Sequence, residues 1–235
     1  MWLKLLNEPL SDLTCVIWSW GSWFDKYGDD FIKNVSAADP QPAEFLFITD
    51  KNQEGLPLNF KQVIIPDIDY YNRWQYSLEH IKTNWWCALG LDDLIPSDAF
   101  KDLIFEGDIV MSAWVDSNNF IHTPTKERYE QIFENTSFQM QGWWMAKVEL
   151  DKRIPKRLVV FEDWIQWYEF RMHNVDVRFD TKIRMTYVLH KSQHSNINSD
   201  ASAIARVDLM RTLCQQQNVI PGTCWPPECY TQTNT

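Results

Sequence analysis

Trp85-Trp86-Cys87-Ala88-Leu89-Gly90-Leu91-Asp92-Asp93-Leu94-Ile95-Pro96 is the stretch that decides the fold. It is an apolar run of strand length that ends in two adjacent carboxylates and is then stopped by a proline. Parallel strands that are buried on both faces have this composition, and open α/β sheets bind ligands at the carboxyl ends of such strands. The stretch therefore predicts an inner strand whose end carries a candidate site.

The Asp92-Asp93 pair allows two interpretations. Neighbouring carboxylates repel each other unless a cation or a proton lies between them, and such oxygen ligands suit Mg²⁺ or Mn²⁺, which usually also hold substrate phosphates. Alternatively, the pair precedes a helix and stabilises its first turn electrostatically. These two residues alone leave both interpretations open.

The composition is that of a folded protein. The chain has 235 residues, enough for one large α/β domain or two small ones. Its 45% hydrophobic and 14% aromatic residues, 13 of them tryptophans, exclude disorder for most of the chain. A net charge of −10 offers no general attraction to nucleic acids or anionic membranes.

Targeting features point to the cytoplasm. No apolar stretch approaches the ~20 residues that cross a bilayer, and the N-terminus lacks the layout of a secretion signal. The five cysteines are scattered along the chain, although Cys224 and Cys229 could pair or bind a metal. We expect a reduced, cytoplasmic protein without a membrane span.

The first half alternates predicted strands and helices, which is typical of a βαβ unit with parallel strands. We expect strands at 13–18, 44–50 and 61–66 before the decisive strand, and helices at 24–38 and 71–82. This outline resembles a nucleotide-binding half-domain. It contains neither a Gly-x-Gly-x-x-Gly loop nor a Walker-type loop, which argues against a dinucleotide enzyme and a P-loop ATPase.

The second half is richer in aromatic residues. We expect a strand at 108–115, a helix at 125–133 and a short aromatic segment at 141–147, followed by a helix from Asp163, two extended segments at 175–179 and 182–189, and an amphipathic helix at 198–217. Residues 1–218 are expected to form one domain. Residues 219–235, rich in Pro, Thr and Asn, are expected to be a surface tail.

Glu162 and Asp163 are the candidate acid–base residues of the second half. A carboxylate beside Trp164 would be partly desolvated, which raises its proton affinity and suits a general base. The alternative is an acid that stabilises a helix start, typically by ~0.3–1 kcal/mol. Both interpretations remain open from these residues.

Two further motifs have a structural and a functional interpretation. His190 follows an apolar strand, where a single histidine is more often structural. His194 gives a zinc-like spacing, but no Glu stands between the two as in a metalloprotease. Trp143-Trp144 is either core or, if exposed, a stacking platform for a sugar ring or a base.

The order of these segments resembles a GT-A glycosyltransferase of the large family-two type over about residues 11–196. The opening strand, helix and second strand of that family are similar to 16–20, 34–36 and 44–50. The stretch from Asn72-Arg73-Trp74 to Pro96 resembles the helix that leads into the metal-binding Asp-x-Asp strand. Phe161-Glu162-Asp163-Trp164 resembles the Glu-Asp motif, and Tyr187-x-x-His190-x-x-x-x-Ser195 resembles the late histidine.

The resemblance implies a single GT-A-type, Rossmann-like domain with a central, mostly parallel sheet flanked by helices. Residues 11–96 would form the nucleotide-sugar half, 97–196 the acceptor half and 198–217 a C-terminal helix. It also implies Mn²⁺ or Mg²⁺ bound by Asp92, Asp93 and His190. One departure is Gly90, which stands where the family has its first acidic residue.

The remaining roles follow from the same resemblance. Asp163 would be the catalytic base, and Glu162 would orient it or hold an acceptor hydroxyl. Nucleotide-sugar contacts would come from Trp18, Trp20, Asp50, Asn72, Arg73, Leu91 and Asp92. The acceptor side would be lined by Trp143, Trp144 and Trp164.

The leading hypothesis is a metal-dependent, inverting transferase that moves a sugar from a nucleotide-sugar to an acceptor hydroxyl. The acceptor could be a glycan, a protein, a small molecule or a modified nucleic acid. One alternative is a catalytically weak or silent module of the same fold that binds carbohydrate or serves in assembly. Another is a nucleotidyltransferase, although its usual Gly-rich, basic loop is poorly matched by residues 19–22.

Overall fold

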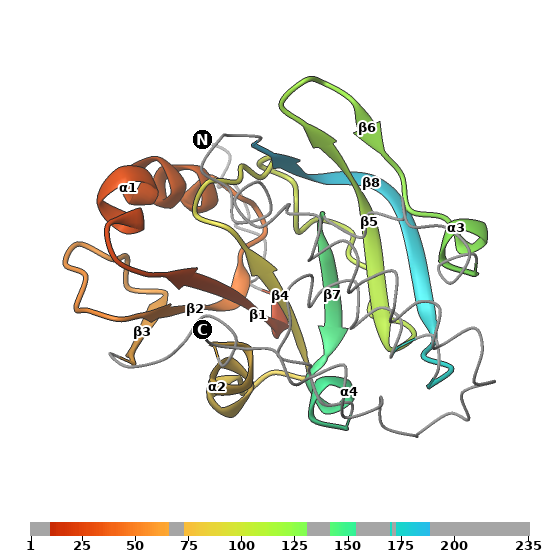
Figure 1. The fold of residues 1–235 in the computed structure, drawn as a ribbon, viewed down its shortest axis with the longest axis horizontal. Helices are drawn as coiled ribbons and strands as arrows, with labels where there is room; N and C mark the ends of the chain where they lie inside the picture. The colour runs from red at the N-terminus through yellow and green to blue at the C-terminus, as the bar shows by residue number, and fades with distance from the viewer. Residues whose placement is uncertain (1–9, 66–72, 131–141, 154–169, 171–172, 189–235) are drawn as a thin grey trace, which may run out of the picture.

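The structure is a computed structural model of the 235-residue chain, and it describes residues 10–65, 73–130, 142–153, 170 and 173–188. Within these ranges the chain forms an eight-stranded sheet whose order is β3-β2-β1-β4-β7-β5-β6, with β8 paired to β5 (Figure 1). None of the helices in the described ranges is long and apolar enough to cross a membrane.

The first half follows the predicted βαβ order closely. Its elements are β1 (Leu10–Ser19), α1 (Trp23–Ser36), β2 (Pro42–Thr49), β3 (Phe60–Ile64), α2 (Arg73–His80) and β4 (Trp85–Leu89). Strands β1, β2, β3 and β4 are paired in parallel. Strand β1 is an inner strand between β2 and β4, and its residues pack into a core cluster on each face of the sheet, as its continuous hydrophobic run requires.

The second half extends the same sheet. Its elements are β5 (Ile109–Asp116), β6 (Ile121–His122), α3 (Lys126–Glu130), β7 (Trp144–Lys147), α4 (Val148–Arg153) and β8 (Val177–Tyr187). Strand β7 is antiparallel to both β4 and β5, whereas β8 is parallel to β5. The prediction of a central, mostly parallel sheet flanked by helices is confirmed, since four of the seven strand pairings are parallel.

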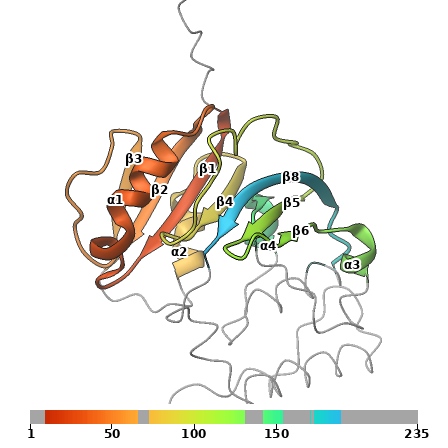
Figure 2. The same cartoon turned by 90° about the horizontal axis from the view of Figure 1, so that it is seen from above.

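Two core clusters lie on opposite faces of the sheet. The first core cluster includes residues from β1, β4, α2 and α4, among them Val16, Trp86, Leu78 and Val148. The second core cluster includes residues from β1, β4, α1 and the segment after β4, among them Ile17, Cys87, Phe31 and Phe100. Successive residues of β1 and β4 belong to the two clusters in turn, because side chains alternate between the faces of a strand. Helices α1 and α2 lie on opposite sides of the strands (Figure 2).

One sequence expectation needs correction: the extended segments 175–179 and 182–189 are parts of a single strand, β8. The pairing with β5 shifts register twice, between the Ser112–Asp180 and Ala113–Ile183 pairs and again before Trp114–Met185. The additional residues of β8 therefore form bulge-like irregularities in its pairing with β5, and the strand continues past them. The helices expected from Asp163 and over 198–217, and the boundary at 218, lie outside the described residues.

Candidate functional site

The carboxylates of Asp92 and Asp93 converge on the end of β4. A Cβ atom at Gly90 would lie 2.8 Å from Oδ1 of Asp92 and 2.8 Å from Oδ2 of Asp93. The chain turns here, and the amide of Asp93 donates to the carbonyl of Gly90 at 3.2 Å. Gly90 is therefore the residue that lets both carboxylates approach the strand end, and a side chain there would displace them.

Asp93 is buried in this turn. The residue is 8% exposed, and its Oδ1 accepts a hydrogen bond from the amide of Val188 at 3.3 Å. Burial first, and then the neighbouring charge of Asp92, raises the pKa of Asp93 to about 8. The pair thus has the oxygen donors and the unfavourable crowding of charge that a divalent cation would relieve.

The end of β8 reaches the same carboxylates. Leu94 and Thr186 form an isolated antiparallel bridge with two backbone hydrogen bonds of 3.0 and 2.7 Å. The amide of Val188 then contacts Asp93. His190 follows two residues later and lies outside the described residues, so its proposed place as a metal ligand stays a prediction.

The described residues do not by themselves form a complete metal site. No group of three or more His, Cys, Asp and Glu side chains suited to a metal ion occurs in those ranges. Mg²⁺ and Mn²⁺ often bind through one or two protein carboxylates together with water and substrate phosphates. The Asp92-Asp93 pair fits that pattern of hard oxygen donors.

Asp50 lies just after the carboxyl end of β2, and its side chain contacts the turn that follows β1. Its Oδ2 accepts a hydrogen bond of 3.0 Å from the amide of Gly21, a residue whose φ of +59° favours glycine. Its other oxygen, Oδ1, is buried, and the same is true of Nε1 of Trp20. Neither atom has a hydrogen-bond partner in the described part of the chain, so the turn presents one acceptor and one donor that a ligand could satisfy.

The other predicted nucleotide-sugar residues have mixed placements. Trp18 is half-buried, its Nε1 donates to Ser77 Oγ at 2.9 Å, and its ring meets the edge of Trp86 at 6.4 Å between centroids. Leu91 is 4% exposed and belongs to the second core cluster. Arg73 begins α2 with its side chain outside what the structure describes, and Asn72 precedes the described range.

The adjacent tryptophans Trp143 and Trp144 point to opposite faces of the sheet. Trp143 is 1% exposed in the second core cluster. Its ring therefore has no open face to stack on an acceptor, which corrects the expectation for this residue. Trp144 is half-buried and packs edge-on against Trp86, with 5.0 Å between centroids. Trp164, Glu162 and Asp163 lie outside the described residues.

The sequence analysis missed a buried arginine that ties β8 to the segment after β4. Arg184 is 1% exposed, and its guanidinium carbon lies 5.5 Å from the centre of the Trp143 ring. It donates to Ser112 Oγ, to Asp180 Oδ2 and to the backbone carbonyls of Ala99, Lys101 and Asp102. The only sequence signal was a single arginine between Ile183 and Met185, and the register shift beside it turns the side chain inward.

We expect the stability of the metal-free protein to decline as pH rises from 5 to 8. The folded state holds a proton on Asp93 up to about pH 8, whereas the unfolded chain releases it near 3.8. Asp93→Asn should remove this decline and be more stable than the parent at pH 8, as measured by urea denaturation. Asp29→Asn, an exposed change on α1, should keep the parent's pH dependence.

Saturating Mn²⁺ provides the complementary measurement. A bound cation favours the ionised carboxylate, so it should reduce the decline in the parent. Identical pH profiles for the parent and Asp93→Asn would contradict the buried, protonated state of Asp93.

The chain has no match by sequence, either to a family model or to a curated protein. By structure, the class is clear: the mixed α/β sheet is the fold of GT-A-type glycosyltransferases. At 13% identity or less this likeness shows the fold.

One protein whose structures it resembles is TarS of S. aureus. The structure of TarS 1–349 in complex with UDP-GlcNAc matches with a TM-score of 0.60 at 13% identity, over 86% of this chain and 66% of that one. The complex with UDP matches with a TM-score of 0.57 at 13% identity, over 86% and 65%. A third structure of TarS 1–349 matches with a TM-score of 0.54 at 13% identity, over 88% and 73%. The chain thus spans about two thirds of the first two TarS chains.

Proposed function

We propose that this protein is a metal-dependent, inverting glycosyltransferase that uses a nucleotide-sugar donor. The observation that carries the proposal is the convergence of Asp92 and Asp93 over Gly90 at the end of β4. In open α/β sheets this is the edge at which ligands bind. The shared fold with TarS, whose structures contain UDP-GlcNAc and UDP, supports a UDP-sugar as the first donor to test.

Two parts of this edge would bind the donor. Asp92 and Asp93, with His190, would hold Mn²⁺ or Mg²⁺, which would neutralise the charge on the departing diphosphate. Asp50 and Trp20 have a buried acceptor and a buried donor that a nucleotide base or ribose could pair with. Such pairing would select the nucleotide, because a ligand without matching groups leaves these atoms unsatisfied.

The acceptor side would supply the base. An acceptor hydroxyl is a poor nucleophile and gains from a carboxylate that accepts its proton, the role proposed for Asp163. Glu162 would orient that carboxylate or the hydroxyl, and Trp144 and Trp164 would line the acceptor. A single displacement by the hydroxyl inverts the anomeric carbon.

A thermal-shift series with UDP and GDP, each with and without Mn²⁺, tests the proposal. We expect UDP to raise the melting temperature only when Mn²⁺ is present, by mass action on the folded state. Asp92→Ala should abolish this shift, because the cation loses a carboxylate ligand. Asp29→Ala removes the same charge from the exposed face of α1 and should respond like the parent.

The result that would contradict the metal assignment is an unchanged UDP shift in Asp92→Ala. The second candidate function is a silent module of the same fold, which is favoured by Gly90 in place of an acidic residue. Release of UDP from UDP-GlcNAc distinguishes the two, because a silent module would bind the nucleotide-sugar without turning it over.

A further inference from the structure

The hairpin that joins β5 to β6 carries a second, preorganised cluster of side chains. Asp116 closes the turn: its Oδ1 accepts hydrogen bonds from the amides of Asn118 at 2.8 Å and Phe120 at 3.0 Å. Its Oδ2 lies 3.3 Å from Nε2 of His122. These contacts hold the pKa of Asp116 below its usual range, with the Phe120 amide as the largest cause. The carboxylate therefore fixes both the turn and the imidazole.

His122 lies flat on a buried tryptophan. The rings of His122 and Trp114 are stacked with 3.8 Å between centroids and 6° between planes. Trp114 is 5% exposed, meets the edge of Tyr187 at 5.5 Å, and leaves no room for a side chain at Gly142, whose Cβ would clash with the indole. The stack on Trp114 and the contact of Nε2 with Asp116 orient the imidazole of His122, and Nδ1 of its ring has no hydrogen-bond partner within the described ranges.

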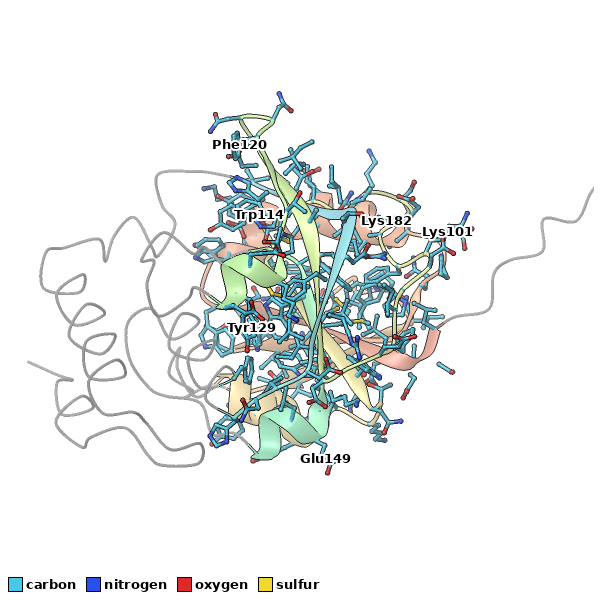
Figure 3. The ribbon with its side chains drawn as sticks, turned by 90° about the vertical axis from the view of Figure 1, so that its right-hand side faces the viewer. Lys101, Trp114, Phe120, Tyr129, Glu149 and Lys182 are labelled. Carbon is cyan, nitrogen blue, oxygen red and sulfur yellow. The ribbon has the colours of Figure 1, made fainter. Side chains whose placement is uncertain are left out.

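Phe120 extends this cluster into solvent. Its residue is 64% exposed, and its ring meets His122 edge-on with 4.8 Å between centroids. Figure 3 shows Phe120 at the tip of the hairpin, with Trp114 deeper along β5. Phe120 and His122 are two residues apart, so they share one face of the hairpin, whereas Ile121, 55% exposed, points to the other.

The cluster lies at the same edge of the sheet as the two carboxylates. Strands β4, β5 and β8 all end at this edge (Figure 1). Three consecutive residues connect the sites: Thr186 pairs with Leu94, the carbonyl of Tyr187 accepts from the amide of Ser117, and the amide of Val188 donates to Asp93. A molecule that reacts beside Asp92 and Asp93 could therefore extend along the end of β8 to the hairpin.

We propose that Phe120 and His122 form an acceptor subsite that binds an uncharged carbohydrate. The exposed ring of Phe120 offers an apolar face for the C–H face of a sugar, and the fixed imidazole beside it offers a hydrogen-bonding nitrogen for a hydroxyl. Residues 114–122 contain no Lys or Arg, and the chain carries a net charge of −10, which disfavours a phosphate backbone. The inference rests on the proposed glycosyltransferase function, since it names the class of acceptor for the same edge.

The test uses a set of neutral oligosaccharides, including chitotetraose and cellotetraose, in titration calorimetry against the full chain. We expect the parent to bind at least one of them, and Phe120→Ala to weaken that binding about five- to tenfold through loss of an aromatic face. His122→Phe keeps the stack on Trp114 but removes the nitrogens, and it should also weaken binding. Ile121→Ala is the matched control on the other face of the hairpin and should bind like the parent.

Three results would overturn the subsite: no neutral oligosaccharide binds, Phe120→Ala binds as tightly as the parent, or Ile121→Ala loses as much affinity as Phe120→Ala. A twelve-nucleotide oligo(dT) is titrated in the same way to test for nucleic-acid binding. If the oligonucleotide binds in a Phe120-dependent manner and the oligosaccharides do not bind, the proposal is also overturned. The UDP and Mn²⁺ thermal shift is measured on the same variants. If neither the parent nor any variant shows the thermal shift with UDP and Mn²⁺, the donor function is contradicted. If the shift is present but no oligosaccharide binds, only the subsite is contradicted.

Discussion

Asp163→Asn should lower kcat by about 10²–10⁴-fold, the usual contribution of a general base. Asparagine has the size of aspartate but cannot accept the proton of an acceptor hydroxyl. The affinity for the donor and the melting temperature should stay close to those of the parent, because the residue is assigned to the acceptor side. The measurement is release of UDP from UDP-GlcNAc in the presence of an acceptor, together with a thermal melt.

The pH profile separates a base from a structural acid at Asp163. A general base gives kcat/KM an acidic limb at the pKa of the free enzyme's base, and Asp163→Asn should lose that limb. A helix-start acid has the opposite signature, in which stability falls and turnover per folded molecule is kept. Normal turnover by Asp163→Asn would show that another residue is the base.

Arg184→Met should lower the free energy of unfolding by about 3–5 kcal/mol, the range for breaking a buried charge pair by removing one partner. The substitution keeps much of the apolar stem but removes the guanidinium donors to the buried Ala99 carbonyl, to the carbonyls of Lys101 and Asp102, and to Oδ2 of Asp180. Although burial opposes ionisation of Asp180, the bonds from the Lys182 amide and Arg184 outweigh it and hold its pKa below the usual range. Urea denaturation at neutral pH gives the loss directly.

Arg178 is the matched control for Arg184 on the same strand. Its side chain is 50% exposed and pairs with Asp176 at 2.9 Å. Arg178→Met should therefore cost about 0–1 kcal/mol, as exposed ion pairs generally do. Equal losses for the two variants would mean that the contacts of the buried guanidinium do not stabilise the fold more than an exposed pair.

Arg184 also connects stability to the candidate site. It binds the carbonyls of Ala99, Lys101 and Asp102. Strand β8 in turn places Thr186 and Val188 beside Leu94 and Asp93. Loss of these hydrogen bonds should therefore also disturb the positions of Asp92 and Asp93. The same strand end positions Tyr187 against Trp114 beneath the proposed acceptor subsite.

The sequence by itself determined the inner strand, the parallel βαβ order and the acidic strand end. Each of these depends on interactions that are local or periodic: β4 is an apolar run stopped by a turn, α1 shows helical spacing, and parallel strands end at a common edge. The sequence pattern around Trp85–Pro96 therefore sufficed to place Asp92 and Asp93 at the end of β4.

Only the tertiary structure decided which side chains are buried together. Trp143 and Trp144 look alike in the sequence, yet Trp143, just before β7, packs in the core against Arg184, whereas Trp144, the first residue of β7, packs against Trp86. The raised pKa of Asp93 needs the packing of β8, and the Trp114–His122 stack needs a hairpin turn and a glycine from a distant segment. These features arise from contacts between residues up to about a hundred positions apart, and no local pattern encodes such contacts.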